Sequence, residues 1–165
     1  MNNYKSIKAK ILQQEQLNDI IADWKANDEK IVFTNGCFDI IHQGHIDYLA
    51  KASDLGTKLI IGVNTDRSVS AIKGKHRPIQ DEYSRMMILA AMQFVDAVIL
   101  FDQDTPIELI STVIPNVLVK GSDYKAENIV GYHVVTKNGG KVETLDFLEG
   151  FSTSAIEQKI IVSRA

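Results

Sequence analysis

Two histidines three residues apart, His42 and His45, are the clearest candidates for chemistry in this sequence. They end the segment 34–45, in which a glycine turn follows a β-branched run and Gly44 separates the histidines. At this spacing both rings lie on one face of a helix start and can donate hydrogen bonds to the same phosphate. The amides and the dipole of a helix start also favour an anion. We therefore predict that His42 and His45 stabilise charge developing on a phosphorus centre under attack.

Three other interpretations of these residues are open. The histidines can be ordinary surface residues of a helix, although a strand, a turn and a helix start in succession is the setting of a phosphate site. A zinc site would need Cys, Asp or Glu at standard ligand spacing, which we do not find, so no protein-held metal is predicted. Cys37 invites a nucleophile hypothesis because His42 is near, but no orienting third group can be identified.

Further candidate ligand-binding residues follow later β-branched segments. In Lys-Gly-Ser-Asp-Tyr, residues 120–124, a glycine lets the backbone approach a ligand, and Asp123 can accept from a ribose or a base. A simple turn closed by Gly and Asp is the alternative. Ser152 and Thr153 precede the last helix, so they cap it and can also donate to phosphate. The predicted nucleotide-binding residues are Asn35, Gly36, Cys37, Phe38, Gly44, Lys120, Gly121, Asp123, Ser152 and Thr153.

A basic segment, residues 73–85, can supply counter-charge for phosphates in a protein that is acidic overall. A charge run is usually a solvated surface. This one follows the second β-branched run, at the end of a strand that would face a ligand, which favours a functional role. Asp66, just before it, is equally suited to cap a helix. The predicted substrate-binding residues are Asp39, Asp66 and Arg77.

Five β-branched runs and the helical segments between them must position these residues. The predicted strands are residues 30–34, 58–63, 97–101, 116–119 and 141–145, and the predicted helices are 46–55, 82–94, 106–113, 126–138 and 154–162. Strands that are apolar on successive residues are covered on both faces. Strand alternating with helix indicates a parallel sheet with right-handed crossovers.

We therefore predict an α/β fold, a Rossmann-like open parallel five-stranded sheet with helices on both faces. Residues 1–165 would form one domain, with a helical extension over residues 1–28 in which Leu17, Ile20, Ile21 and Trp24 lie at helical spacing. In such a sheet, ligands bind at the carboxyl ends of the strands where the strand order reverses. The candidate residues follow those ends.

Composition narrows the classes of partner. The 165 residues are 45% hydrophobic and 24% charged, as in a globular domain. A formal net charge of -3 gives no general attraction for nucleic acid or an anionic membrane. The polar start and the single cysteine, Cys37, fit neither a signal peptide nor an internal disulfide. We predict a soluble cytoplasmic protein with no nucleic-acid or membrane partner.

Residues 36–45, GCFDIIHQGH, resemble the signature of the nucleotidyltransferase superfamily, which contains cytidylyltransferases, adenylyltransferases and class I aminoacyl-tRNA synthetases. Its His-x-Gly-His motif is matched by His42, Gly44 and His45. The resemblance implies that the histidines contact a triphosphate and stabilise a pentacoordinate transition state without acting as nucleophiles. Lys73 and Arg85 fall where related transferases place phosphate-binding cations. The predicted catalytic residues are His42, His45, Lys73 and Arg85.

Two further segments, VKGSDY at 119–124 and EGFSTS at 149–154, are similar to the adenylyltransferase domain of the ADP-heptose synthesis proteins. The similarity covers about residues 17–160. It implies transfer of AMP from ATP, with Mg²⁺, to D-glycero-β-D-manno-heptose 1-phosphate for lipopolysaccharide precursors. A sugar kinase often precedes this domain, and we expect a separate kinase here. Relatives usually form homo-oligomers, so we expect a dimer or a tetramer.

The predicted mechanism is an in-line displacement at the α-phosphorus of ATP. The attacking phosphate oxygen is already ionised at neutral pH, so positioning and charge stabilisation suffice. Three alternatives are CMP transfer to glycerol 3-phosphate, AMP transfer to flavin mononucleotide, and nucleotide binding without turnover. The cytidylyltransferase branch has an arginine at the position of Phe147, which favours the heptose-type branch. The complete set of His42, His45 and basic residues favours an enzyme.

Overall fold

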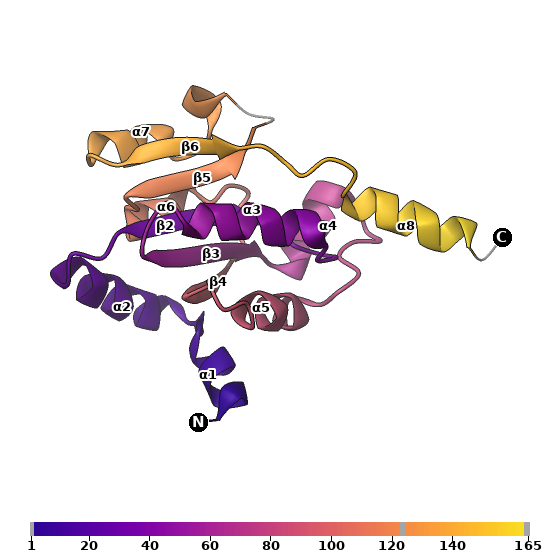
Figure 1. Ribbon diagram of the computed structural model, residues 1–165, viewed down its shortest axis with the longest axis horizontal. Helices are drawn as coiled ribbons and strands as arrows, with labels where there is room; N and C mark the ends of the chain where they lie inside the picture. The colour runs from indigo at the N-terminus through magenta and orange to yellow at the C-terminus, as the bar shows by residue number, and fades with distance from the viewer. Residues whose placement is uncertain (1, 123–124, 164–165) are drawn as a thin grey trace.

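A six-stranded parallel sheet forms the centre of the fold, in the order β1-β4-β3-β2-β5-β6 (Figure 1). The structure is a computed structural model and describes residues 2–122 and 125–163. Its strands are β1 (Ile11–Leu12), β2 (Ile31–Gly36), β3 (Lys58–Asn64), β4 (Ala97–Phe101), β5 (Val117–Gly121) and β6 (Lys141–Leu145). The predicted parallel α/β sheet is confirmed, but the predicted count of five strands was one too low. The missed strand, β1, has only two residues and shows no period in the sequence.

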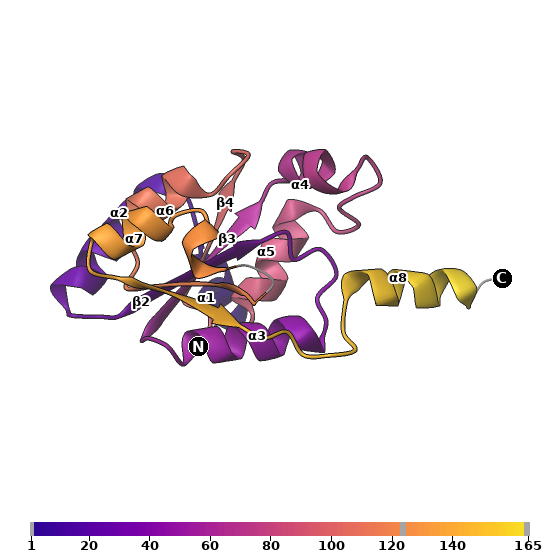
Figure 2. The ribbon, with the colours of Figure 1, turned by 90° about the horizontal axis from the view of Figure 1, so that it is seen from above.

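Helices cover both faces of the sheet (Figure 2). They are α1 (Asn3–Ala9), α2 (Gln14–Ala26), α3 (Gln43–Ser53), α4 (Asp66–Lys73), α5 (Glu82–Ala90), α6 (Ile107–Val113), the 3₁₀-helix η1 (Ala126–Asn128), α7 (Tyr132–Lys137) and α8 (Thr153–Val162). α1 and α2 lie within the helical extension predicted over residues 1–28, whereas the sequence did not predict α4. The helix predicted over 126–138 is divided into η1 and α7 because Gly131, with φ of 95°, adopts a left-handed conformation between them.

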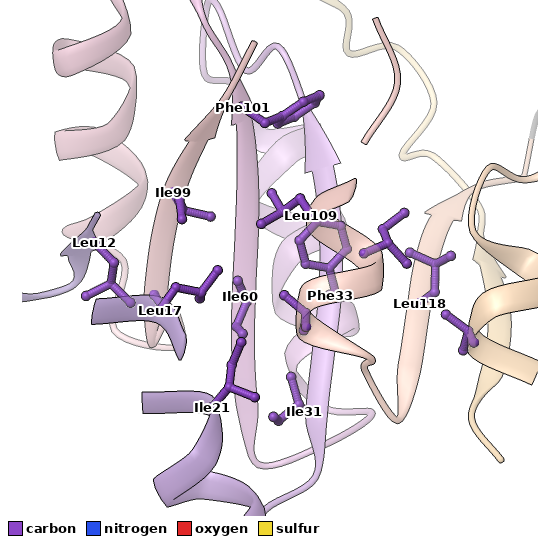
Figure 3. Close-up of a cluster of buried hydrophobic side chains, with 14 of the residues drawn as sticks. Leu12, Leu17, Ile21, Ile31, Phe33, Ile60, Ile99, Phe101, Leu109 and Leu118 are labelled. Atoms are coloured by element: carbon purple, nitrogen blue, oxygen red, sulfur yellow. The ribbon is translucent and has the colours of Figure 1, made fainter. Parts of the chain in front are cut away.

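Two apolar cores lie on opposite faces of the sheet. In β2, Phe33 packs with α2, α6 and α7 (Figure 3). The adjacent Val32 packs with α3 and α5 on the other face. Ile60 and Ile61 divide in the same way in β3. Side chains alternate between the faces of a strand, so successive apolar residues serve both cores. Leu17, within the predicted N-terminal extension, is fully buried in the first of these cores.

The strand order reverses at β2. From β2 the chain continues to β3 and β4 on one side, and then crosses to β5 on the other side. The segments that follow β2 and β5 therefore diverge, which leaves a crevice at their carboxyl ends. α8 extends away from the rest of the molecule at this end of the sheet (Figures 1 and 2). In the ranges 2–122 and 125–163, no helix has the length and apolar character needed to cross a membrane.

Candidate functional site

A pocket of about 460 Å³ lies at the carboxyl ends of β2 and β5, where the strand order reverses. This volume is within the usual range for small-ligand sites. Its walls come from the end of β2 and the following loop, the start of α3, the end of α4, the end of β5 and the segment joining β6 to α8. Residues far apart in the sequence therefore meet around one space.

Most of the predicted catalytic and nucleotide-binding residues line this pocket. They are His42, His45, Lys73, Asn35, Gly36, Cys37, Phe38, Gly44, Lys120, Gly121, Ser152 and Thr153. Of the predicted substrate-binding residues, Asp39 lines the pocket, whereas Asp66 and Arg77 do not. Arg85 is also absent from the walls. Asp123 lies outside the described residues.

The two histidines form a stacked pair at the start of α3. His42 is the N-cap residue of the helix, and the ring centroids of His42 and His45 are 3.9 Å apart with 25° between the planes. Gly44 permits this arrangement, because a Cβ atom there would lie 3.1 Å from the His42 ring and 3.2 Å from Phe151 Cβ. The predicted meeting of both rings on one helix face is therefore what the structure contains.

Both imidazoles have lowered pKa values. Burial lowers the pKa of His42. Burial, together with the charges of His42 and Lys73, lowers the pKa of His45 from 6.5 to about 4. At neutral pH each ring is thus neutral and carries one N–H donor. The Nδ1 atoms of both rings are buried without a hydrogen-bond partner among the described residues, which leaves Nε2 to meet a ligand.

Phe38, in the loop after β2, supports His45 through an aromatic contact. Phe38 adopts a φ of 48°, a left-handed conformation that residues other than glycine rarely adopt. Its ring lies edge-on to His45, with centroids 5.5 Å apart. The same ring lies 3.1 Å from the position that a Cβ atom of Gly36 would take. Gly36 therefore leaves the space in which Phe38 packs against His45.

Arg85 is a buried structural centre rather than a surface cation. Its guanidinium has no exposed area and donates to the carbonyl oxygens of Cys37 at 2.5 Å, Asn64 at 2.7 Å and Gln80 at 3.1 Å. It also pairs with the Asp66 carboxylate at 2.8 Å. Direct contact with phosphate, the predicted role of Arg85, does not fit this burial. A signal existed in the sequence, because Arg85 shares a face of α5 with the buried Leu89 four residues later.

Asp39 and Arg77, both predicted to bind substrate, bind each other. One Asp39 oxygen accepts from Arg77 Nε at 2.5 Å, and the other accepts from the amides of Ile79 at 2.8 Å and Gln80 at 3.0 Å. Burial acts to raise the pKa of Asp39, but these hydrogen bonds outweigh it and hold the pKa below its usual value. Asp39 is therefore an ionised anchor for the basic segment. Asp66 likewise pairs with Arg85. The prediction that Asp66 caps a helix was wrong by one residue, because the N-cap of α4 is Thr65, whose side chain accepts from the Ser68 amide.

Cys37 does not have the features of a nucleophile. Burial raises the pKa of its thiol, and the Sγ atom points to Asn64 Oδ1 at 3.8 Å. A thiol with a raised pKa stays protonated at neutral pH and is inert. The geometry thus agrees with a role for Cys37 as part of the pocket wall.

Several wall residues were not among the predicted site residues. They are Tyr48, Phe147, Leu148, Phe151 and Ser154. Tyr48 lies one helical turn after His45 and its hydroxyl is 2.8 Å from Thr34 Oγ1, so the spacing could have revealed it. Phe147, Leu148 and Phe151 lie in an irregular segment after β6, where no periodicity indicates which side chains turn inward.

A family model described as cytidylyltransferase-like matches residues 33–159. The matched range includes the histidine pair, the basic segment and the start of α8. The chain belongs to the cytidylyltransferase-like family. This membership confirms the predicted place in the nucleotidyltransferase superfamily.

Individual relatives agree with the family assignment. The chain is 52% identical over 158 residues to the bifunctional protein HldE of Campylobacter jejuni. The matched segment covers 96% of this chain and 33% of that protein. HldE of Methylobacillus flagellatus is 49% identical over 151 residues, covering 92% of this chain and 31% of the relative. This cytidylyltransferase-like chain therefore spans about a third of the length of these curated relatives.

Solved structures share the fold. The lipopolysaccharide core biosynthesis protein from Thermoplasma volcanium superposes with a TM-score of 0.58 at 29% identity, covering 73% of this chain and 97% of that one. Pantoate-β-alanine ligase from Francisella tularensis, solved with an ATP compound and β-alanine, has a TM-score of 0.64 at 16% identity, covering 94% and 78%. The second likeness concerns the cytidylyltransferase-like fold alone.

The lowered pKa of His45 predicts a specific pH dependence of stability. The folded pKa is about 4 and the ordinary value is 6.5, so the unfolded chain binds more protons between these values. The stabilisation is complete above the ordinary pKa and is lost as pH falls through the folded pKa. His45→Gln lacks this effect. The free energy of unfolding of His45→Gln, relative to that of wild type, should therefore rise by about 1–2 kcal/mol when the pH is lowered from about 7 to about 4.5, after allowance for partial exposure. Urea unfolding at both pH values measures it, and a pH-independent difference would contradict the burial argument.

The different environments of Lys73 and Arg85 predict different effects of their loss. Arg85→Ala removes the partner of three carbonyls and a carboxylate, and should lower the free energy of unfolding by about 3–5 kcal/mol. Lys73→Ala, on the exposed pocket wall, should change stability by less than about 0.5 kcal/mol. It should weaken binding of inorganic triphosphate roughly tenfold, the value of one charge-assisted hydrogen bond. Lys75→Ala is the control, since Lys75 does not line the pocket. A stable Arg85→Ala protein that fails to bind inorganic triphosphate would show instead that Arg85 contacts phosphate.

Proposed function

We propose that this chain transfers AMP from ATP to a sugar 1-phosphate, D-glycero-D-manno-heptose 1-phosphate, and releases pyrophosphate. The observation that carries the proposal is the stacked pair of neutral imidazoles, His42 and His45, on the wall of a pocket that also contains the start of α8 and Lys73. Family membership supports the reaction class. The resemblance of residues 119–124 and 149–154 to ADP-heptose synthesis proteins supports the acceptor, as does the similar lipopolysaccharide core biosynthesis protein.

The reaction is an in-line displacement. An ionised oxygen of the acceptor phosphate forms a bond to the α-phosphorus of ATP, the bond from that phosphorus to the bridging oxygen breaks, and pyrophosphate takes the bonding electrons. No proton has to be removed from the acceptor, so no general base is required. The residues act by holding the reactants in line and by stabilising the charge that builds on the phosphate oxygens.

The groups around the pocket suit this task. The Nε2–H groups of His42 and His45 would donate to oxygens of the α-phosphate and the leaving group. The ammonium of Lys73 would offset charge on the pyrophosphate. At the start of α8, the amides of Thr153 and Ser154 have no partner within the helix and would bind a further oxygen. Neutral imidazoles gain most when negative charge increases, so they favour the transition state over bound ATP.

The acceptor and the base would use the more apolar walls. Phe147 and Phe151 keep 55% and 43% of their surface exposed, and Tyr48 lies beside Phe147 with ring centroids 6.0 Å apart. Aromatic faces of this kind fit a purine or the apolar side of a sugar ring. The absence of an arginine at Phe147 supports the heptose-type branch over CMP transfer.

Mg²⁺ would arrive with ATP and supply counter-charge to the triphosphate. Among the described residues, no group of three His, Cys, Asp or Glu side chains could hold a metal ion. Asp39 is the one carboxylate on the described pocket wall, and three donors already occupy its oxygens. The wall therefore fits an ion carried by phosphate oxygens and water, the arrangement that Mg²⁺ prefers.

The proposed setting is the cytoplasm, where a homo-oligomer, dimer or tetramer, would act on ATP and a free sugar phosphate. The formal net charge of -3 supports small anionic substrates over nucleic acid or an anionic membrane. Positive charge is placed locally at the pocket by Lys73 and Lys120.

The function predicts a defined substrate preference. In a matrix of ATP, CTP and GTP against heptose 1-phosphate anomers, glycerol 3-phosphate and flavin mononucleotide, pyrophosphate release should be fastest with ATP and a heptose 1-phosphate. A site that hydrogen-bonds the edge of adenine rejects another base, because that base would leave buried polar groups of the protein without partners. Preference for CTP with glycerol 3-phosphate would reassign the chain to the cytidylyltransferase branch, and preference for flavin mononucleotide would make it an FAD synthetase. Nucleotide binding without pyrophosphate release would make it a binding module.

The roles of the histidines predict a split between turnover and binding. His45→Ala removes a donor that acts mainly in the transition state, so kcat should fall roughly 10²- to 10³-fold. Affinity for ATP should stay within about tenfold of wild type. His133→Ala, which alters an exposed histidine on α7, is the matched control and should behave as wild type. A folded His45→Ala protein with near-normal kcat would remove the central element of the mechanism.

A further inference from the structure

α8 begins in the pocket and then leaves the body of the protein (Figures 1 and 2). Ser152, Thr153 and Ser154 line the pocket, yet none of the described residues of α8 is buried. Apolar packing therefore does little to fix the direction of this helix. Something else must determine how its first residues face the pocket.

One ion pair links α8 to the sheet side of the site. Glu157 Oε2 lies 3.2 Å from Arg77 Nη1. Within residues 2–122 and 125–163, this is the side-chain hydrogen bond that joins α8 to a distant part of the chain, since the others involving α8 are local to its ends. Glu157 follows Thr153 by four residues, so both lie on the same face of the helix. A contact at Glu157 consequently sets which face of α8 Thr153 presents to the pocket.

Arg77 is held firmly on its other side. Its side chain is 10% exposed, and its Nε atom donates to Asp39, whose side chain is 1% exposed. Asp39 also holds the amides of Ile79 and Gln80, so Arg77 cannot turn away without breaking a buried ion pair. The Arg77 guanidinium is therefore fixed against Asp39, which lies in the loop after β2, three residues before His42. In this position Arg77 presents its Nη1 atom to α8.

We propose that Glu157 and Arg77 are positioning residues that hold the start of α8 against the pocket. Asp39, Arg77 and Glu157 form a chain of ion pairs from the loop preceding the histidines to α8, here called the α8 relay. Its effect is to keep the amides and hydroxyls of Thr153 and Ser154 opposite His42 and His45. The identity of the ligand rests on the proposed function, but the attachment of α8 does not.

The relay divides into a strong and a weak half. The pair between Arg77 and Asp39 is buried, whereas the Glu157 side chain is 44% exposed. A partly exposed ion pair contributes little to global stability. Loss of Glu157 should therefore release α8 and weaken binding at its first residues, while the rest of the fold stays intact. This makes Glu157 a better test residue than Arg77, whose loss would leave Asp39 unpaired.

The test compares Glu157→Ala with Gln158→Ala, the adjacent exposed residue, so that both variants gain the same helix-forming residue. Amide hydrogen exchange of the free protein reports on residues 153–162, and calorimetric titration with ATP and Mg²⁺, without acceptor, reports on binding. Glu157→Ala should accelerate exchange in α8 and raise the Kd for ATP, each about 2- to 5-fold, as expected for one partly exposed pair. Its melting temperature should equal that of wild type.

Gln158→Ala should match wild type in both measurements, and Glu157→Asp, which keeps the charge, should recover part of the ATP affinity. Unchanged exchange in α8 of Glu157→Ala would overturn the attachment, and unchanged ATP affinity would overturn its role at the site. Exchange is measured without any substrate. It therefore judges the relay separately from the substrate preference that tests the proposed function.

Discussion

A buried guanidinium holds together the three segments on which the candidate site is built. Arg85 binds the carbonyl of Cys37 after β2, that of Asn64 at the end of β3 and that of Gln80 in the basic segment. Burial of a charge is costly unless its donors are satisfied, and here carbonyls and Asp66 satisfy them. With the Cys37 carbonyl fixed, Phe38 follows in its left-handed conformation and supports His45. The geometry of the histidine pair thus depends on a residue outside the pocket.

The site that results is prepared for an anion without being strongly charged. His42 and His45 are neutral when the pocket is empty, and a third orphaned atom, Asn35 Oδ1, lies in the same wall. Of the four buried side-chain nitrogen and oxygen atoms without a partner in the described chain, these three lie in the pocket wall, and the fourth is Arg77 Nη2. Buried polar atoms without partners are costly. A bound triphosphate would bring its own charge and raise the pKa of both rings. The two rings then stabilise negative charge most strongly on the phosphate oxygens, where charge builds up in the transition state.

The sequence predicted what local patterns determine. Successive apolar residues revealed the buried strands, and the spacing of His42 and His45 placed both rings at one helix start. It did not reveal β1, whose two residues are defined only by pairing with β4. Nor did it reveal that Arg85 is buried or that Asp39 and Arg77 pair, because these contacts form only when the sheet brings separate loops together. The charged residues of the basic segment consequently have three different roles. Lys73 lies on the pocket wall, Arg85 is buried and binds three loops, and Arg77 positions α8.

The most direct measurement is a crystal structure with a non-hydrolysable ATP analogue and Mg²⁺. The account predicts the triphosphate between the Nε2 atoms of His42 and His45 and the amides of Thr153 and Ser154, within hydrogen-bond distance of both. Lys73 should contact the terminal phosphates, and Arg85 should keep its bonds to the loops. Phosphates bound elsewhere, for example in the second hollow beside Gln103 and Glu108, with the histidines untouched, would contradict it.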